Sequence, residues 1–191
     1  MIFIRTGLIV LISTIFCLCI SCGSTVPTPF ADNNTGPTVV TNTLIQEDFE
    51  SGYAAWKATG SGFVNTISSG RSGTIGLNIA TVFTPSTTIL NRYIAVDTNM
   101  HYILSGYMKP LNQPETHVIG MQYVDANSNA ISSTAVYAGT TNYYEYEQRR
   151  MVLSPKNVPQ AKYLNVYLML QYSAGVNKAV KFDDIVLVGY K

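Results

Sequence analysis

Carboxylates near the two ends of the chain are the side chains best suited to chemistry. Asp183 and Asp184 interrupt a closing run rich in β-branched residues, and Glu50 follows Asp48 about 130 residues upstream. An unpaired carboxylate costs several kcal/mol to bury. Two adjacent aspartates in a strand therefore need a cation, a hydrogen-bond network or a strand end that reaches water. We interpret the pattern as first and last strands that meet around one bound cation.

Residue patterns typical of catalysis are missing from the sequence. His101 and His117 lack the spacing of metal ligands, and no Gly-x-Ser-x-Gly motif is present. Glu145 and Glu147 would project to the same side of a strand, about 7 Å apart along the backbone. Paired acids on a tyrosine-rich strand are more often surface residues than an acid–base pair. The sequence therefore predicts that the protein is not an enzyme.

The first 21 residues have the pattern of an export signal. Arg5 precedes a mostly apolar run over residues 8–20, which is too short to span a bilayer comfortably. Residues 18–23 (LCISCG) resemble a bacterial lipobox, in which the cysteine, here Cys22, becomes the lipidated first residue. We expect residues 1–21 to be a lipoprotein signal peptide and the mature protein to be anchored to a lipid membrane of the bacterial cell envelope, at the outer membrane or cell surface. An ordinary signal peptide cleaved nearby is the alternative.

Cysteine content and charge exclude several classes of protein. The three cysteines lie at or before position 22, so the rest of the chain can form neither a disulfide framework nor a thiolate metal site. Removal of the signal also removes Arg5, which leaves equal numbers of basic and acidic residues. A neutral chain without a basic face is a poor ligand for phosphates, so we expect no nucleic-acid partner.

The remaining chain divides into a linker and one domain. Residues 22–43 are rich in proline and small polar residues, and we expect them to form a flexible tether. Residues 44–191 show short runs of alternating apolar residues between turn signals, with no convincing amphipathic helix. This pattern predicts an all-β sandwich or barrel. In the runs 118–124 and 131–137 both alternating sets of side chains contain apolar residues, so the alternation does not predict which set faces the core.

Four motifs, in order, resemble those of jelly-roll carbohydrate-binding modules of the family 4, 9 and 22 type. They comprise residues 48–52 (DFESG) with Trp56, residues 72–79 (SGTIGLNI), residues 102–109 (YILSGYMK) and residues 182–187 (FDDIVL). The resemblance spans nearly all of residues 44–191. It implies a jelly-roll β-sandwich of two antiparallel sheets, whereas the ligand depends on the site and not on the fold.

The resemblance also implies a structural calcium ion between the two ends of the domain. Its carboxylate ligands correspond to Glu50 and Asp183, and backbone carbonyls of residues 70–72 would complete the shell. Such an oxygen-rich set suits Ca²⁺, which accepts six to eight oxygen ligands. The alternative is that both carboxylates are solvated at strand ends.

Modules of this family stack sugar rings on aromatic side chains across one sheet. Strand alternation predicts that Tyr107 and Tyr167 point away from the core, whereas Tyr137 lies in a run whose core-facing side chains the sequence does not predict. We expect all three to be ligand-binding residues, with Tyr107 and Tyr167 in one platform.

These observations predict a non-catalytic, lipid-anchored module that binds a glycan. The alternative is a surface or envelope lipoprotein of the same fold that serves protein interaction, adhesion or assembly.

Overall fold

The computed structural model describes residues 41–80, 85–111, 116–131, 134–140, 144–154, 158–172 and 178–191, with the side chain of residue 172 excepted. Within these ranges no helix is long and apolar enough to cross a membrane. The predicted signal peptide, Cys22 and almost all of the predicted linker lie outside them. The first strand begins at Thr41, three residues before the predicted start of the domain.

Strands make up nearly all of the regular structure in the described residues. They are β1 (Thr41–Glu47), β2 (Lys57–Gly60), β3 (Phe63–Ile67), β4 (Gly76–Ala80), β5 (Ser86–Ala95), β6 (His101–Pro110), β7 (Thr116–Val124), β8 (Val136–Ala138), β9 (Glu147–Leu153), β10 (Tyr163–Tyr172) and β11 (Ala179–Tyr190).

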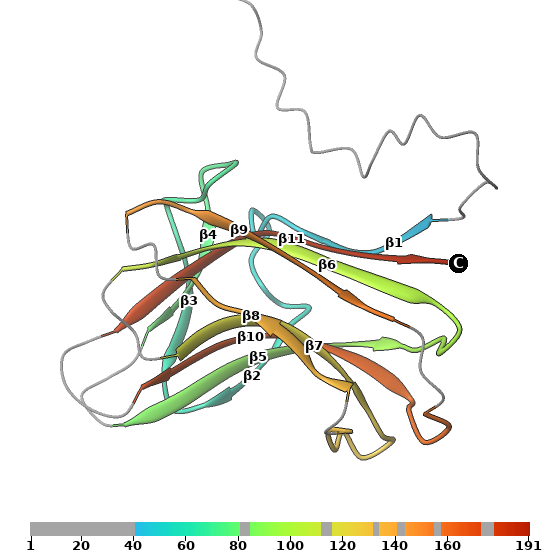
Figure 1. The fold of residues 1–191 in the computed structure, drawn as a ribbon. Helices are drawn as coiled ribbons and strands as arrows, with labels where there is room; N and C mark the ends of the chain where they lie inside the picture. Colours follow the sequence, from blue (N-terminus) through green and yellow to red (C-terminus); the bar gives the residue numbers. More distant parts are fainter. Residues whose placement is uncertain are drawn as a thin grey trace, which may run out of the picture. The chain divides into compact units, whose positions relative to one another are not determined.

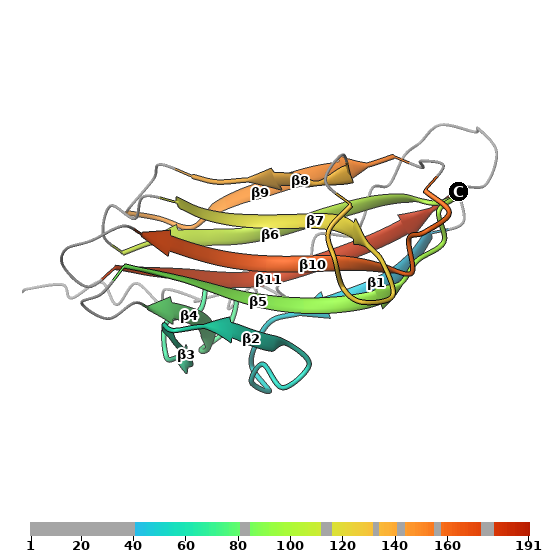
Figure 2. The same cartoon turned by 90° about the horizontal axis from the view of Figure 1, so that it is seen from below.

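The strands form two antiparallel sheets that pack face to face (Figure 1). One sheet has the order β3-β4-β11-β6-β9, and β1 also pairs with β11. The other has the order β2-β5-β10-β7-β8, which Figure 2 shows from below. The predicted fold class, a jelly-roll β-sandwich of two antiparallel sheets, is confirmed.

Strand alternation builds the core between the sheets. On β10 the inward residues Leu164, Val166, Leu168 and Leu170 are all completely buried, as their spacing predicts. Full burial of such a side chain contributes about 1.5–3 kcal/mol. Trp56 is also buried and packs against Phe49, with ring centroids 6.2 Å apart. The single tryptophan therefore belongs to the core and not to an exposed platform.

The structure orients the two runs that the sequence leaves open. On β7, Ile119, Met121 and Tyr123 belong to the core cluster, which leaves Gly120 and Gln122 on the outward parity. Among the described residues of the second run, those that belong to a strand begin at Val136, in β8 (Val136–Ala138).

The last strand, β11, joins the two ends of the domain. Along one edge it pairs first with β4, through residues 179–182, and then with β1, through residues 185–190. The first and last strands therefore meet, as predicted. Asp183 and Asp184 fall where one partner ends and the other begins, and the register with β6 shifts at the same point. Asp184 adopts a left-handed backbone with φ of 50°, which marks this irregularity.

Candidate functional site

A row of outward-facing residues crosses the five-stranded sheet. The strand register places Tyr137 of β8 beside Gly120 of β7, Gly120 beside Tyr167 of β10, and Tyr167 beside Asn91 of β5. Successive side chains point to opposite faces of a sheet, and the neighbours of Tyr167 in sequence are core residues. The row therefore faces away from the core. We call it the tyrosine row, and it brings together two of the predicted ligand-binding residues, Tyr137 and Tyr167.

Gly120 makes room for the ring of Tyr167. A Cβ atom at position 120 would overlap the Tyr167 ring, so the ring lies over the glycine. Tyr137, on the other side of Gly120, is 67% exposed. Burial raises the pKa of Tyr167, and the Tyr137 hydroxyl adds to this effect. Tyr167 is therefore a neutral phenol at physiological pH, able both to donate and to accept a hydrogen bond.

Asn165, one outward position before Tyr167 on β10, carries a buried acceptor without a partner. The side chain is 5% exposed, and its Nδ2 donates a hydrogen bond to Oδ1 of Asn91 at 2.9 Å. Its own Oδ1 receives no hydrogen bond in the described part of the chain. A buried polar atom without a partner costs about 1–3 kcal/mol. A ligand hydroxyl that gained access to this oxygen and donated a hydrogen bond to it would recover that cost.

Two further tyrosines extend the aromatic surface beyond the tyrosine row. Tyr93 of β5 and Tyr163 of β10 pack edge to face with centroids 6.3 Å apart, and both are more than one-third exposed. The strand register pairs Tyr93 directly with Asn165. Sequence reasoning missed both tyrosines. Tyr163 belongs to the same alternating set of side chains as Tyr167, so the sequence carries a signal for it, whereas no pattern singled out above predicts a strand at β5.

The expectation that Tyr107 shares a platform with Tyr167 is wrong. Tyr107 lies on β6, which belongs to the six-stranded sheet, so the two rings face outward from opposite sheets. Alternation predicts whether a side chain points in or out but not which sheet carries it. The guanidinium of Arg71 also covers the ring, 3.6 Å from its centroid, and pairs with Asp184 at 2.7 Å. Tyr107 is therefore part of a local cation–π contact.

The two carboxylates predicted as metal ligands approach the same loop, between β3 and β4. Asp183 Oδ2 accepts hydrogen bonds from the backbone N–H groups of Arg71, at 2.5 Å, and Ser72, at 3.3 Å. Glu50 Oε1 accepts from the backbone N–H of Ile75 at 2.8 Å. On β11, residues 183 and 184 lie between the residues that pair with β4 and those that pair with β1, and the loop approaches Asp183 at this point. We call this arrangement the carboxylate junction.

Asp183 bears an electrostatic cost that these donors do not remove. The residue is completely buried, and this burial raises the pKa of its carboxyl despite the N–H group of Arg71. At the exposed Glu50, the hydrogen bond from Ile75 lowers the pKa. The described residues contain no cluster of three or more His, Cys, Asp or Glu side chains able to hold a metal ion. A cation at the junction would need main-chain carbonyls as well, as the resemblance implies.

The fold is that of a β-sandwich module, and one of its two sheets carries an outward row of tyrosines. Residues 41–173 match a family model described as a carbohydrate binding domain, of the family 4 and 9 type. The match covers well over half of the chain, and the chain therefore belongs to this carbohydrate-binding family. No curated protein sequence matches the chain at a significant level.

Several solved structures of similar fold are carbohydrate-binding modules. A family 16 module is 19% identical with a TM-score of 0.57, and the match covers 76% of this chain and 99% of that one. A family 22 xylan-binding domain from Paenibacillus barcinonensis is 16% identical with a TM-score of 0.54, and the match covers 79% of this chain and 96% of that domain. A family 61 module in complex with β-1,4-galactotriose is 16% identical with a TM-score of 0.52, and the match covers 74% of this chain and 93% of that module.

Larger proteins also contain this fold. The enzymatically active domain of a bacteriophage CBA120 tailspike protein is 12% identical with a TM-score of 0.54, covering 70% of this chain but only 19% of the tailspike chain. At these identities the likeness concerns the fold alone.

Proposed function

We propose that the protein binds a glycan, without catalysis, on the outward face of its five-stranded sheet. The observation that carries this proposal is the buried, unpartnered Oδ1 of Asn165, a residue whose position on the sheet lies between Tyr167 and the Tyr93–Tyr163 pair. Family membership supports a carbohydrate ligand. The tyrosine row and Asn165 supply the two kinds of contact that such a ligand needs, ring surface and hydrogen-bonding groups.

Sugar rings present C–H groups on their faces and hydroxyls around their edges. The C–H groups pack on aromatic rings such as Tyr137 and Tyr167, while hydroxyls donate to Asn165. By analogy with bases on aromatic platforms, each ring contributes about 1–3 kcal/mol. One ring alone gives no better than millimolar affinity, since about 4 kcal/mol corresponds to that Kd. Both rings and the hydrogen bond are therefore needed.

Calorimetry with the full chain against β-glucan, xylan, mannan and galactan tests the proposal. Tyr167→Ala and Asn165→Ala should each weaken binding about tenfold or more, because each removes one kind of contact. Tyr107→Ala is the matched control, since it removes a ring from the opposite sheet and should leave affinity unchanged. Binding to none of these glycans would favour the alternative, a protein-interaction module of the same fold.

The contacts of Glu147 do not support an enzymatic role for the acid pair Glu145 and Glu147. Glu147, one of the two acids considered above, forms an ion pair with Arg149 at 2.5 Å and accepts a hydrogen bond from Thr140. These contacts give it a structural role on β9.

A structural calcium ion at the carboxylate junction is the second part of the proposal. Glu50 and Asp183 come from opposite ends of the domain and approach one loop. No described cation pairs with the buried Asp183, because the guanidinium of Arg71 pairs with Asp184 instead. A hard divalent cation would supply the missing positive charge and link both chain ends to the loop.

Lipid anchoring through Cys22 is the third part of the proposal. The signal pattern of residues 1–21 and the lipobox-like residues 18–23 support it. It would hold the glycan-binding domain at the bacterial cell envelope through a proline-containing tether.

A further inference from the structure

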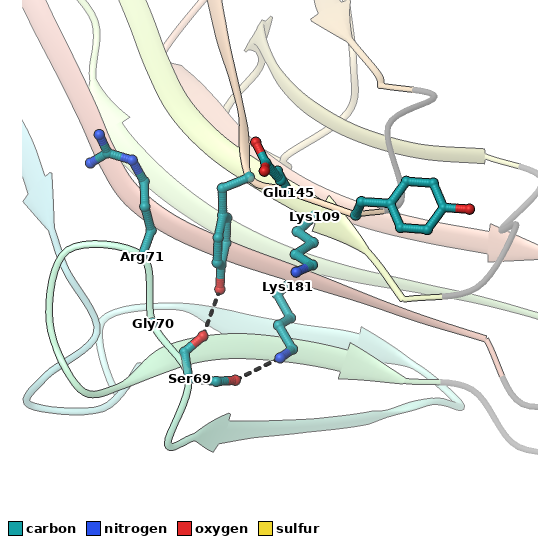
Figure 3. Close-up of a pocket in the computed structure, with 8 residues that line it drawn as sticks. Ser69, Gly70, Arg71, Lys109, Glu145 and Lys181 are labelled. Carbon is teal, nitrogen blue, oxygen red and sulfur yellow. Dashed lines mark hydrogen bonds between the residues drawn. The ribbon is translucent and has the colours of Figure 1, made fainter.

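The outward face of the six-stranded sheet carries an open pocket of about 450 Å³. Figure 3 shows the lysines Lys109 of β6 and Lys181 of β11 on its floor, the loop residues 69–71 along one side, and Glu145 opposite. The volume falls within the range of about 300–1,000 Å³ that small-molecule sites occupy. This pocket is separate from the tyrosine row, which faces outward from the other sheet.

The two lysines stand directly opposite each other on neighbouring strands. Like charges in this arrangement destabilise a sheet. Lys181 donates a hydrogen bond to the hydroxyl of Ser69 at 2.6 Å, which supplies no negative charge. Burial and then the neighbouring charge of Lys109 lower the pKa of Lys181. Neither lysine forms an ion pair with any described carboxylate.

The other groups in the pocket suit a sugar ring. Tyr144, which is 85% exposed, offers ring surface at the rim. Tyr146 donates a hydrogen bond from its hydroxyl to the backbone carbonyl of Ser69 at 3.0 Å and so fixes the loop. Glu145 is the one carboxylate among the described lining residues, and it can accept hydrogen bonds from sugar hydroxyls. A simple inorganic anion would use the lysines alone, whereas an acidic sugar would also contact Tyr144 and Glu145 with its ring and its hydroxyls.

We propose that this pocket binds an acidic sugar residue, whose carboxylate or sulfate group lies between Lys109 and Lys181. The anion would neutralise the facing ammonium groups and accept charge-assisted hydrogen bonds from both. The inference extends the proposed glycan binding to a second site on the opposite sheet, and the ligand of this site differs from that of the tyrosine row in carrying a negative charge.

Calorimetry and thermal melting of the full chain test this site. The probes are a uronate trisaccharide, a sulfated galactose trisaccharide and neutral galactotriose, at low and at physiological salt. Lys109→Gln and Lys181→Gln should each weaken binding of the acidic probe about tenfold or more, and added salt should weaken wild-type binding. Lys162→Gln removes an exposed lysine outside the pocket and should change nothing.

The lysine variants separate a binding role from a structural one. Because each removes a like-charge contact, it should leave the melting temperature unchanged or raise it, while abolishing the increase that the acidic probe produces in the wild type. Binding of either acidic trisaccharide in this manner supports the site, and the preferred probe identifies the acidic group. Inorganic sulfate that binds as tightly as the sulfated sugar would overturn the sugar assignment.

Failure of this inference differs from failure of the proposed function. Acidic-sugar binding that disappears in Tyr167→Ala but persists in the lysine variants would overturn the second site and leave glycan binding on the tyrosine row intact. Binding of acidic probes through the lysines, with no binding of neutral glycans, would support the second site and reject the tyrosine row. The absence of any acidic-probe binding at low salt would overturn the second site.

Discussion

Asp183 and Asn165 are almost completely buried polar side chains that the fold alone does not fully satisfy. Burial raises the pKa of Asp183 although backbone N–H groups donate to it, and Oδ1 of Asn165 accepts no hydrogen bond from the described residues. Natural proteins pair nearly all buried polar atoms, so each exception asks for an explanation. A cation at the first residue and a sugar hydroxyl at the second would satisfy both.

The calcium proposal predicts that a chelator destabilises the protein. An ion that binds only the folded state adds about 2.7 kcal/mol at a hundredfold excess over its Kd, so EDTA should lower the melting temperature measured by calorimetry. Asp183→Asn should abolish that response. Asp97→Asn, which removes an exposed carboxylate paired with Lys191, should retain it. Identical melting curves with and without EDTA would remove calcium from the proposal.

Buried His117 on β7 predicts a loss of stability in mild acid. Burial lowers the pKa of His117, so below about pH 6.5 the unfolded chain binds a proton that the folded chain does not. The free energy of unfolding should therefore fall as pH decreases from about 6.5, by up to about 1.4 kcal/mol per pH unit, until the folded-state pKa is reached.

Urea unfolding across pH 5–8 measures this effect. His117→Gln should flatten the decline, whereas His101→Gln, which removes a ring stacked on Tyr190, should leave it unchanged. If the free energy of unfolding of His117→Gln still falls by the full amount, other titrating groups cause the decline.

At the scale of strands, the sequence predicts alternation better than it predicts partners. The inward set of β10 follows directly from its spacing, and the face of Tyr102, Leu104 and Met108 on β6 is likewise buried. Which sheet receives each strand depends on contacts distant in sequence, which a local pattern does not encode. For this reason the sequence predicts one platform for Tyr107 and Tyr167, although the two residues lie on different sheets.

Other parts of the site were beyond prediction for related reasons. In the run 118–124 both alternating sets of side chains contain apolar residues, and Val118 is buried although it belongs to the outward set. Only the pairing of β7 with β10 therefore shows which set faces the core. The contact of Arg71 with Tyr107 joins a loop to a strand distant in sequence. Asp183 and Asp184 are easier to predict as site residues, because two charged side chains within an otherwise apolar strand are visible in the sequence itself.

The close approach of the Tyr167 ring to Gly120 predicts that Gly120→Ala weakens glycan binding. The added methyl group would displace the Tyr167 ring from the tyrosine row, so affinity measured by calorimetry should fall about as far as in Tyr167→Ala. The two changes should not be additive, because both act through the same ring. The double variant Gly120→Ala/Tyr167→Ala should thus bind as Tyr167→Ala does. Additive losses would show that Gly120 acts independently of the ring.

At the scale of the whole molecule, the sandwich presents two different surfaces from its two sheets. The tyrosine row offers uncharged aromatic and amide groups, and the pocket on the other sheet offers the positive charges of Lys109 and Lys181. A polysaccharide that carries neutral and acidic residues could engage both surfaces on one or several molecules. At a membrane, tethered copies would bind such a polymer with higher effective affinity than single sites provide.

Anchoring predicts how the whole protein partitions between membrane and solution. If Cys22 carries lipid, the protein expressed in bacteria should enter the detergent phase and the membrane fraction, and Cys22→Ala should release it into soluble fractions. Cys17→Ala is the matched control, because position 17 lies within the predicted signal peptide but outside the lipobox-like residues 18–23, and would be lost on processing. Its mature product should remain anchored. Mass spectrometry of the mature N-terminus should find acyl chains on Cys22 in the wild type. Equal detergent partitioning of Cys22→Ala and the wild type would show that the anchor is wrongly assigned.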